Sequence, residues 1–191
     1  MNSSAPEPAV PPEVLARAAR VRLLLCDVDG ILTDGGVYVG AGGEAKRFHV
    51  RDGLGIAYWR RAGFQVGWVS ARPSPATEVR ARELQVDFLL QQREPKTGVI
   101  EGLLQQLGHT WAETAFLGDD LVDLGPLRRA GLAATVPHAH PEALKLAHYV
   151  TRLPGGHGAV REVIELLLRA HGQWDAMVAD ALGGAGTRPA A

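Results

Sequence analysis

Short apolar runs alternate with segments of helical spacing through most of the chain. Runs with the length and residue types of buried strands lie at 21–28, 64–70, 86–90, 114–117, 132–135 and 149–151. Helices are predicted at 13–20, 53–62, 75–84, 96–107, 124–130, 141–147 and 159–170. Strands that alternate with helices of about ten residues form a mostly parallel sheet. The predicted fold class is therefore α/β, a doubly wound, Rossmann-like sheet with helices on both faces.

The segment after the first predicted strand departs from this alternation. From Val37 to Val50, two alternating runs flank a glycine-rich turn. This pattern predicts a β-hairpin at about 36–50. An antiparallel hairpin does not join a parallel sheet easily, so we expect it to project as a flap over the site or as a contact with another subunit.

The length of 191 residues, with 46% hydrophobic side chains, suits one well-packed domain. We expect a flexible lead with a short helix at 1–20, a single domain at 21–171 and a flexible tail at 172–191.

Charge and hydropathy narrow the range of partners. A net charge of -1 provides no basic field for a nucleic acid or an anionic membrane, so neither partner is expected. No apolar run approaches the roughly 18 residues of a membrane helix, and the amino end lacks the build of a secretion signal. The expected location is the cytoplasm. The single cysteine, Cys26, lies in an apolar run and is expected to be a small core residue.

Polar side chains follow several predicted strands directly. Because the carboxyl ends of parallel strands share one edge of a sheet, seven residues should converge there: Asp27, Asp29, Ser70, Lys96, Asp119, Asp120 and Asp123. Asp27 and Asp29 should point the same way, since side chains alternate along a strand. On its own this pair fits a strand end with two solvated acids equally well. The larger set of crowded carboxylates favours a bound cation, and ligands that are all oxygen favour Mg²⁺.

This set of residues suits phosphoryl transfer. With Mg²⁺ on one side of a phosphate, Lys96 and the Ser70 hydroxyl would hold other phosphate oxygens while Asp27 attacks phosphorus in line. Asp29 would protonate the leaving alcohol and later take a proton from the hydrolytic water.

Four ordered motifs also carry a resemblance: Asp27-Val28-Asp29-Gly30, Ser70, Lys96, and Gly118-Asp119-Asp120 with Asp123. They resemble the motifs of the haloacid dehalogenase superfamily of phosphatases. Longer stretches, including residues 26–35, 50–56 and 149–162, resemble its phosphatases of 3-deoxy-D-manno-octulosonate 8-phosphate. The likeness covers about 22–170.

The resemblance implies roles for individual residues. Asp27 matches the nucleophile, and Asp29 matches a general acid/base whose backbone carbonyl also binds Mg²⁺. Asp119 matches a metal ligand, and Asp120 matches a neighbour that holds metal-bound water. Ser70 and Lys96 match the phosphate-binding hydroxyl and lysine.

The resemblance also implies a substrate and an assembly. Gly53 and Arg72 match positions near the substrate, and Arg51 is a further candidate. The implied substrate is an acidic sugar phosphate of lipopolysaccharide inner-core synthesis. Members of this type lack a large cap domain and form homotetramers, in which the hairpin of one subunit helps to close a neighbouring site.

Two positions depart from the family pattern. Ser70-Ala71 stands where many relatives have Thr-Gly, which keeps the hydroxyl. His157 stands in the late glycine-rich segment where an arginine is expected, so substrate preference could differ.

Three other hypotheses stay open at this stage. A nine-carbon keto-sugar acid 9-phosphate fits a similar open site. A phosphoacceptor receiver domain uses the same residue types, although its motifs come in a different order. A catalytically silent assembly domain would not need both Asp27 and Asp29.

Overall fold

A six-stranded parallel sheet forms the centre of the molecule, in the order β5-β4-β1-β6-β7-β8. The computed structural model describes residues 10–183. The strands of this sheet are β1 (Leu23–Cys26), β4 (Gln65–Ser70), β5 (Phe88–Gln91), β6 (Thr114–Leu117), β7 (Leu132–Thr135) and β8 (Tyr149–Val150). The predicted α/β class with a parallel sheet is confirmed.

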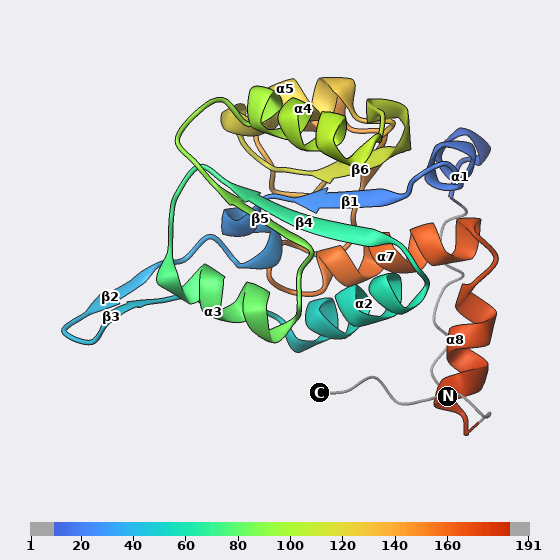
Figure 1. Ribbon diagram of the computed structural model, residues 1–191, viewed down its shortest axis with the longest axis horizontal. Coiled ribbons are helices and arrows are strands. Elements are labelled where there is room, and N and C mark those ends of the chain that lie inside the picture. Colours follow the sequence, from blue (N-terminus) through green and yellow to red (C-terminus); the bar gives the residue numbers. More distant parts are fainter. Residues whose placement is uncertain (1–9, 184–191) are drawn as a thin grey trace.

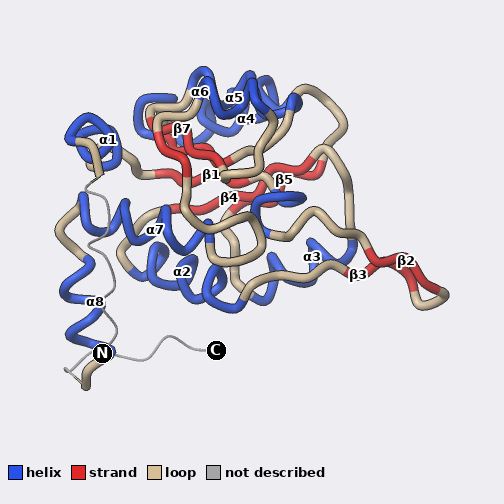
Figure 2. The backbone as a smooth tube through the Cα atoms, turned by 180° about the vertical axis from the view of Figure 1, so that it is seen from behind, coloured by secondary structure: helices blue, strands red, loops and turns tan. Residues whose placement is uncertain are grey.

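Helices cover both faces of the sheet. In the described part of the chain they are α1 (Pro12–Ala18), α2 (Val50–Arg61), α3 (Pro75–Glu83), α4 (Lys96–Leu107), α5 (Leu124–Arg129), α6 (Pro141–Leu146), α7 (Ala159–Ala170) and α8 (Trp174–Ala181). Figures 1 and 2 show α4, α5 and α6 on one face and α2, α3 and α7 on the other. None of the helices in residues 10–183 has both the length and the apolar character needed to cross a bilayer.

Strand β1 lies at the centre of the sheet and is buried along its whole length. Its continuous apolar sequence is typical of a parallel strand covered on both faces. Cys26 is level with Trp68 of β4 on one side and Leu117 of β6 on the other. The residues that follow these three strands therefore reach the same edge of the sheet.

The inserted hairpin consists of β2 (Tyr38–Gly40) and β3 (Gly43–Ala45), paired antiparallel. A bridge between Thr33 and Phe48 closes its base. The hairpin projects well beyond the body of the domain, close to the start of α3 (Figure 1). On β2 the apolar residues Tyr38 and Val39 are 58% and 82% exposed.

The carboxyl-terminal part differs from the sequence-based expectation. Residues 172–191 were expected to be a flexible tail, but helix α8 lies within them. Trp174 packs under two guanidinium groups of α7, with Arg161 at 5.3 Å and Arg169 at 5.1 Å from its ring centroid. Asp180 pairs with Arg61 of α2 at 3.1 Å. These contacts with distant elements stabilise α8, a helix too short to be predicted from its apolar periodicity alone. Residues 1–9 of the predicted lead and 184–191 of the tail lie outside the described residues.

Candidate active site

Three carboxylates meet at the carboxyl ends of β1 and β6. Asp27 directly follows β1, Asp119 lies two residues after β6, and Asp123 ends the short helix at Leu121–Asp123. One oxygen from each of the three lies within 4.8 Å of the others. Asp27 donates its backbone N–H to the carbonyl of Leu117 at 2.8 Å, which joins the two loops.

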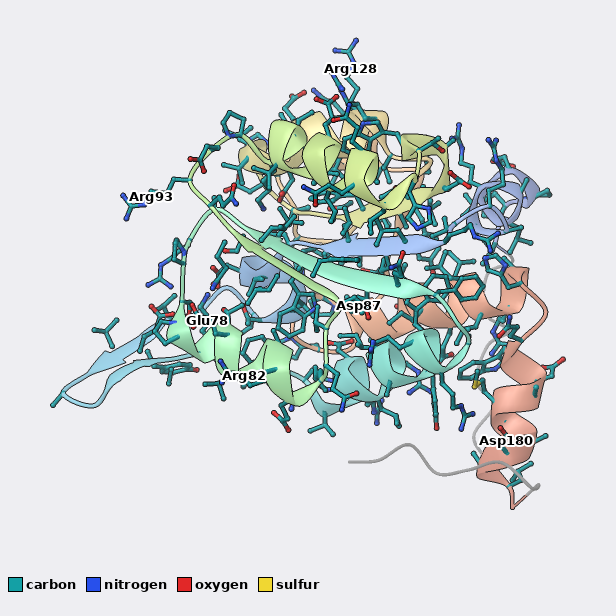
Figure 3. The ribbon with its side chains drawn as sticks, viewed as in Figure 1. Glu78, Arg82, Asp87, Arg93, Arg128 and Asp180 are labelled. Atoms are coloured by element: carbon teal, nitrogen blue, oxygen red, sulfur yellow. The ribbon has the colours of Figure 1, made fainter. Side chains whose placement is uncertain are left out.

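Lys96, the first residue of α4, reaches into this cluster. Its Nζ atom lies 2.5 Å from Oδ1 of Asp27 and 2.7 Å from Oδ1 of Asp123. The other oxygen of Asp123 accepts the backbone N–H groups of Asp119, at 3.0 Å, and Asp120, at 3.2 Å. Asp123 therefore holds both the lysine and the loop that carries Asp119. By contrast, Figure 3 shows the cations Arg93 and Arg128 pointing away from the body of the protein.

The chain turns sharply immediately after Asp27. β1 ends at Cys26, and Val28–Leu32 form a tight turn in which Gly30 has a φ of 95°. The strand has therefore ended before either acid, so the alternation of side chains along β1 does not by itself set the directions of Asp27 and Asp29, and their common direction stays a prediction. The carboxylate of Asp29 faces the hairpin residue Lys46.

The late glycine-rich segment packs on this turn. A Cβ atom added to Gly155 would lie 1.7 Å from the carbonyl oxygen of Gly30, so only glycine fits there. Gly156 donates its backbone N–H to the carbonyl of Ile31 at 2.9 Å. The segment just before α7 therefore forms a wall of the catalytic turn.

The hairpin contacts the same edge through β3 and the residue after it. Glu44 pairs with Arg72 at 2.5 Å and accepts the hydroxyl of Ser74 at 2.6 Å. Ser70, buried at the end of β4, exchanges hydrogen bonds with the backbone of Arg72 at 3.0 Å. These contacts tie the hairpin to the loop that carries the predicted phosphate-binding hydroxyl.

Curated relatives and solved structures are similar to this chain over most of its length, whereas no family model matches it. The 3-deoxy-D-manno-octulosonate 8-phosphate phosphatase KdsC of Yersinia pestis is 43% identical over 159 residues, 83% of this chain and 85% of that protein. The KdsC of Escherichia coli K12 is 41% identical over 164 residues, 85% of this chain and 87% of that protein. The chain belongs to the KdsC phosphatase family.

Solved structures agree with this assignment. The KdsC-type phosphatase of Moraxella catarrhalis, in complex with magnesium, phosphate and KDO, is 36% identical and superposes with a TM-score of 0.86, covering 88% of this chain and 98% of that one. A cobalt-bound phosphatase from Haemophilus influenzae is 35% identical with a TM-score of 0.80, covering 84% and 94%. Both solved structures therefore hold a metal ion.

Charge and burial at the carboxylate cluster favour a cation, as expected for a KdsC phosphatase. Burial and the Asp123 charge raise the pKa of Asp27 to about 7, although the charge and hydrogen bond of Lys96 act in the opposite direction. Burial and the neighbouring acids Asp123 and Asp120 raise the pKa of Asp119 to about 7. Burial lowers the pKa of Lys96, but Asp27 and Asp123 outweigh it, so the net pKa is raised. The single positive charge of Lys96 therefore does not balance the negative charges of the three carboxylates.

The donor atoms fit a magnesium ion. Oδ1 of Asp119 is buried and has no hydrogen-bond partner within residues 10–183, as expected of an oxygen reserved for a ligand. The cluster offers carboxylate oxygens without histidine or cysteine, which suits Mg²⁺. Asp27 and Asp119 thus lie where the sequence placed them. Asp120 lies outside the three-carboxylate group, is exposed, and accepts the backbone N–H of Leu121 at 2.7 Å.

The candidate substrate residues lie at the start of α2 and on the loop after β4. Arg51 is exposed on the first turn of α2, and Arg72 is exposed beside the hairpin. Gly53 is buried, and a Cβ atom added to it would lie 2.7 Å from a guanidinium nitrogen of Arg80. No hydrogen bond within the described residues joins these three to the carboxylate cluster, so their roles stay predictions.

Sequence reasoning missed several residues near this site. Asp123 was placed at the edge of the sheet without a role, although an acid four residues after Asp119 is a signal for a loop-capping side chain. Arg80 lies on α3, and its buried Nε atom has no hydrogen-bond partner within residues 10–183. The same is true of Nδ1 of His49 and Oδ2 of Asp52, which line one small cavity with Arg80 and Gly53. No pattern in the sequence distinguished them.

Proposed function

We propose that this protein is a Mg²⁺-dependent phosphatase that hydrolyses 3-deoxy-D-manno-octulosonate 8-phosphate to the free sugar acid and phosphate. The observation that carries the proposal is the group of Asp27, Asp119, Asp123 and Lys96, in which all but the half-buried Asp119 are buried. It occurs in a chain 43% identical to a KdsC phosphatase. The product would supply lipopolysaccharide inner-core synthesis.

In the first half of the reaction, a carboxylate oxygen of Asp27 attacks phosphorus. A bond forms between this oxygen and phosphorus, the bond to the sugar oxygen breaks, and Asp29 gives that oxygen a proton. The product of this step is an aspartyl-phosphate on Asp27.

In the second half, water attacks the same phosphorus atom. Asp29 takes a proton from the water, the bond between phosphorus and Asp27 breaks, and inorganic phosphate leaves. A magnesium ion held by Asp27, Asp119 and the adjoining loop residues, among them Asp29 through its backbone carbonyl and Asp120 through water, would neutralise the phosphate charge.

Other side chains would bind the substrate. Lys96, whose Nζ atom lies 2.5 Å from Oδ1 of Asp27, would bind a phosphate oxygen while Asp27 attacks phosphorus. The Ser70 hydroxyl would bind another phosphate oxygen after giving up its backbone contacts. Arg72, Arg51 and the backbone at Gly53 would bind the sugar acid.

The proposal includes a homotetramer in the cytoplasm. The exposed apolar side chains of Tyr38 and Val39 at the hairpin support self-association through this element. In such an assembly the hairpin of one subunit would help to close a neighbouring site. Replacing Tyr38 and Val39 by serine should shift the mass measured by light scattering towards smaller species, whereas an unchanged mass would reject the hairpin as a subunit contact.

A substrate panel tests the function. Phosphate release is measured from eight- and nine-carbon keto-sugar acid phosphates, with Mg²⁺ and with EDTA. We expect the eight-carbon 8-phosphate to have the highest kcat/KM and EDTA to abolish its turnover. A preference for the nine-carbon 9-phosphate would support the alternative substrate. Equal and slow release from all of them would indicate a generalist phosphatase.

A further inference from the structure

The side chain of Lys46 is completely buried although it comes from a hairpin that projects from the domain. Its exposed fraction is 0%. The Nζ atom lies 2.7 Å from Oδ1 of Asp29 and donates to Oδ2 at 3.0 Å. The nearest other carboxylate oxygen recorded for it, on Glu44, is 3.9 Å away. Lys46 therefore contacts both oxygens of the predicted general acid/base.

The hairpin is fixed in place next to this contact. Glu44, two residues before Lys46, pairs with Arg72 and accepts the Ser74 hydroxyl. The residue between them, Ala45, is exposed, as expected where side chains alternate along an extended segment. Glu44 and Lys46 thus face the domain together and anchor the segment from which the lysine reaches Asp29.

Asp29 itself lies on a turn that does little to fix its side chain. The turn has no regular helical geometry at Asp29 or Gly30, and the Asp29 side chain is 26% exposed. Within residues 10–183, the hydrogen bond recorded to its carboxylate comes from Lys46. The buried ammonium of Lys46 requires a negative partner, because a charge removed from water without one is costly. The ion pair with Asp29 is therefore strongly favoured over solvation of either group.

We propose that Lys46 is a positioning residue, which holds the carboxyl group of Asp29 in the orientation needed for proton transfer to the leaving oxygen. The inference rests on the proposed phosphatase function, and it assigns the hairpin a role in positioning the general acid/base. Because both Asp29 oxygens are near one Nζ atom, losing the amine would free the side chain to rotate. Proton transfer needs a fixed donor within hydrogen-bond reach, so this freedom would slow the step.

The test compares Lys46→Met, Lys46→Arg and a surface control, Lys145→Met, whose side chain is 67% exposed. Single-turnover rates with enzyme in excess, and KM from steady-state assays, are measured for the best sugar phosphate of the panel and for p-nitrophenyl phosphate. The sugar alcohol needs a proton to leave, whereas nitrophenolate leaves without one. Nitrophenolate release thus reports attack by Asp27 without the contribution of Asp29.

For Lys46→Met we expect release of the sugar to slow by about 100-fold, with KM and the nitrophenolate rate within about three-fold of wild type. Lys46→Arg should recover most of the sugar rate, since it restores a cation able to bind both oxygens. Equal slowing of both substrates would overturn the proposal in favour of a structural role. A raised KM with unchanged sugar release would overturn it in favour of substrate binding.

Failure of this inference is distinguishable from failure of the proposed function. The wild-type panel tests substrate identity, whereas the Lys46 comparison needs only one alkyl phosphate that the wild type hydrolyses. Thermal unfolding of Lys46→Met with and without Mg²⁺ checks that the fold and the metal site are retained. A lost Mg²⁺-induced shift would count against a role confined to Asp29.

Discussion

Asp123 and Lys96 form an ion pair at 2.7 Å in which the side chains are 0% and 2% exposed. Two charges removed from water in this way depend on each other and on Asp27, the second partner of the lysine. The pair thus fixes the amine beside Asp27, the proposed nucleophile. Asp123 is therefore expected to affect both stability and catalysis, although it need not contact the substrate itself.

Replacing Asp123 by alanine should destabilise the protein strongly. The change removes one partner of Lys96 and the acceptor for the backbone N–H groups of Asp119 and Asp120. We expect the free energy of unfolding to fall by about 3–5 kcal/mol, the usual cost of breaking a buried pair. Urea unfolding measures it, with the exposed Glu142→Gln as control. A loss below about 1 kcal/mol would show that Asp27 alone satisfies Lys96.

Replacing Asp27 by asparagine should abolish turnover and leave the fold intact. The amide cannot form the covalent intermediate, and it removes a buried charge whose pKa is already raised to about 7. We expect no measurable phosphate release and, without metal at pH 8, a melting temperature no lower than that of wild type. Activity assays and thermal unfolding on the same preparation measure both. Residual turnover above background would sink the proposed mechanism.

Stability should depend on pH in opposite ways with and without magnesium. The pKa values of Asp27 and Asp119 rise from 3.8 to about 7 on folding, so the folded state binds more protons between these values. The free energy of unfolding of metal-free protein should therefore fall as pH rises from about 4 to about 7. Mg²⁺ binds the deprotonated carboxylates, so its stabilising effect should grow over the same interval.

Melting temperatures measured between pH 5 and 8, in EDTA and in excess Mg²⁺, check this dependence. In Asp119→Asn the metal-free slope should be shallower and the shift caused by Mg²⁺ smaller. A shift on adding Mg²⁺ that is the same at every pH would contradict the link between these carboxylates and the metal.

Replacing Gly30 by alanine should disturb the metal site specifically. A Cβ atom there would lie 2.2 Å from Oδ2 of Asp119, and the φ of 95° disfavours any side chain. We expect Mg²⁺ affinity and kcat each to fall at least about ten-fold, a change of about 1.4 kcal/mol. Gly98→Ala is the matched control, because no atom lies within 4 Å of its added Cβ and α4 should tolerate or favour alanine. Calorimetric titration with Mg²⁺ separates the two variants.

The sequence predicted regular elements well where local signals agree. Residues 114–117, 132–135, 96–107 and 159–170 have the bounds expected, because apolar periodicity and terminal prolines or glycines point to one structure. Apolar runs also located the edge of the sheet where Asp27 and Asp119 meet. Local pattern is sufficient for these features.

Contacts between distant segments set the features that were not predicted. The order of α8 depends on arginines of α2 and α7, and the direction of Asp29 depends on Lys46 of the hairpin. In the sequence Asp123 is one of several neighbouring acids. In the structure its carboxylate accepts hydrogen bonds from Lys96 and from two backbone N–H groups. Such pairings join residues too far apart for spacing to show.

The contact between Gly155 and Gly30 also bears on synthesis of the protein. Asp27 and Asp29, the proposed catalytic acids, are synthesised before the glycine segment that packs against their turn, which follows about 125 residues later. A nascent chain released before residue 156 would carry the nucleophile without the wall that supports its turn. Full activity would therefore require translation beyond residue 156, and a chain that terminates before this residue would have little phosphatase activity.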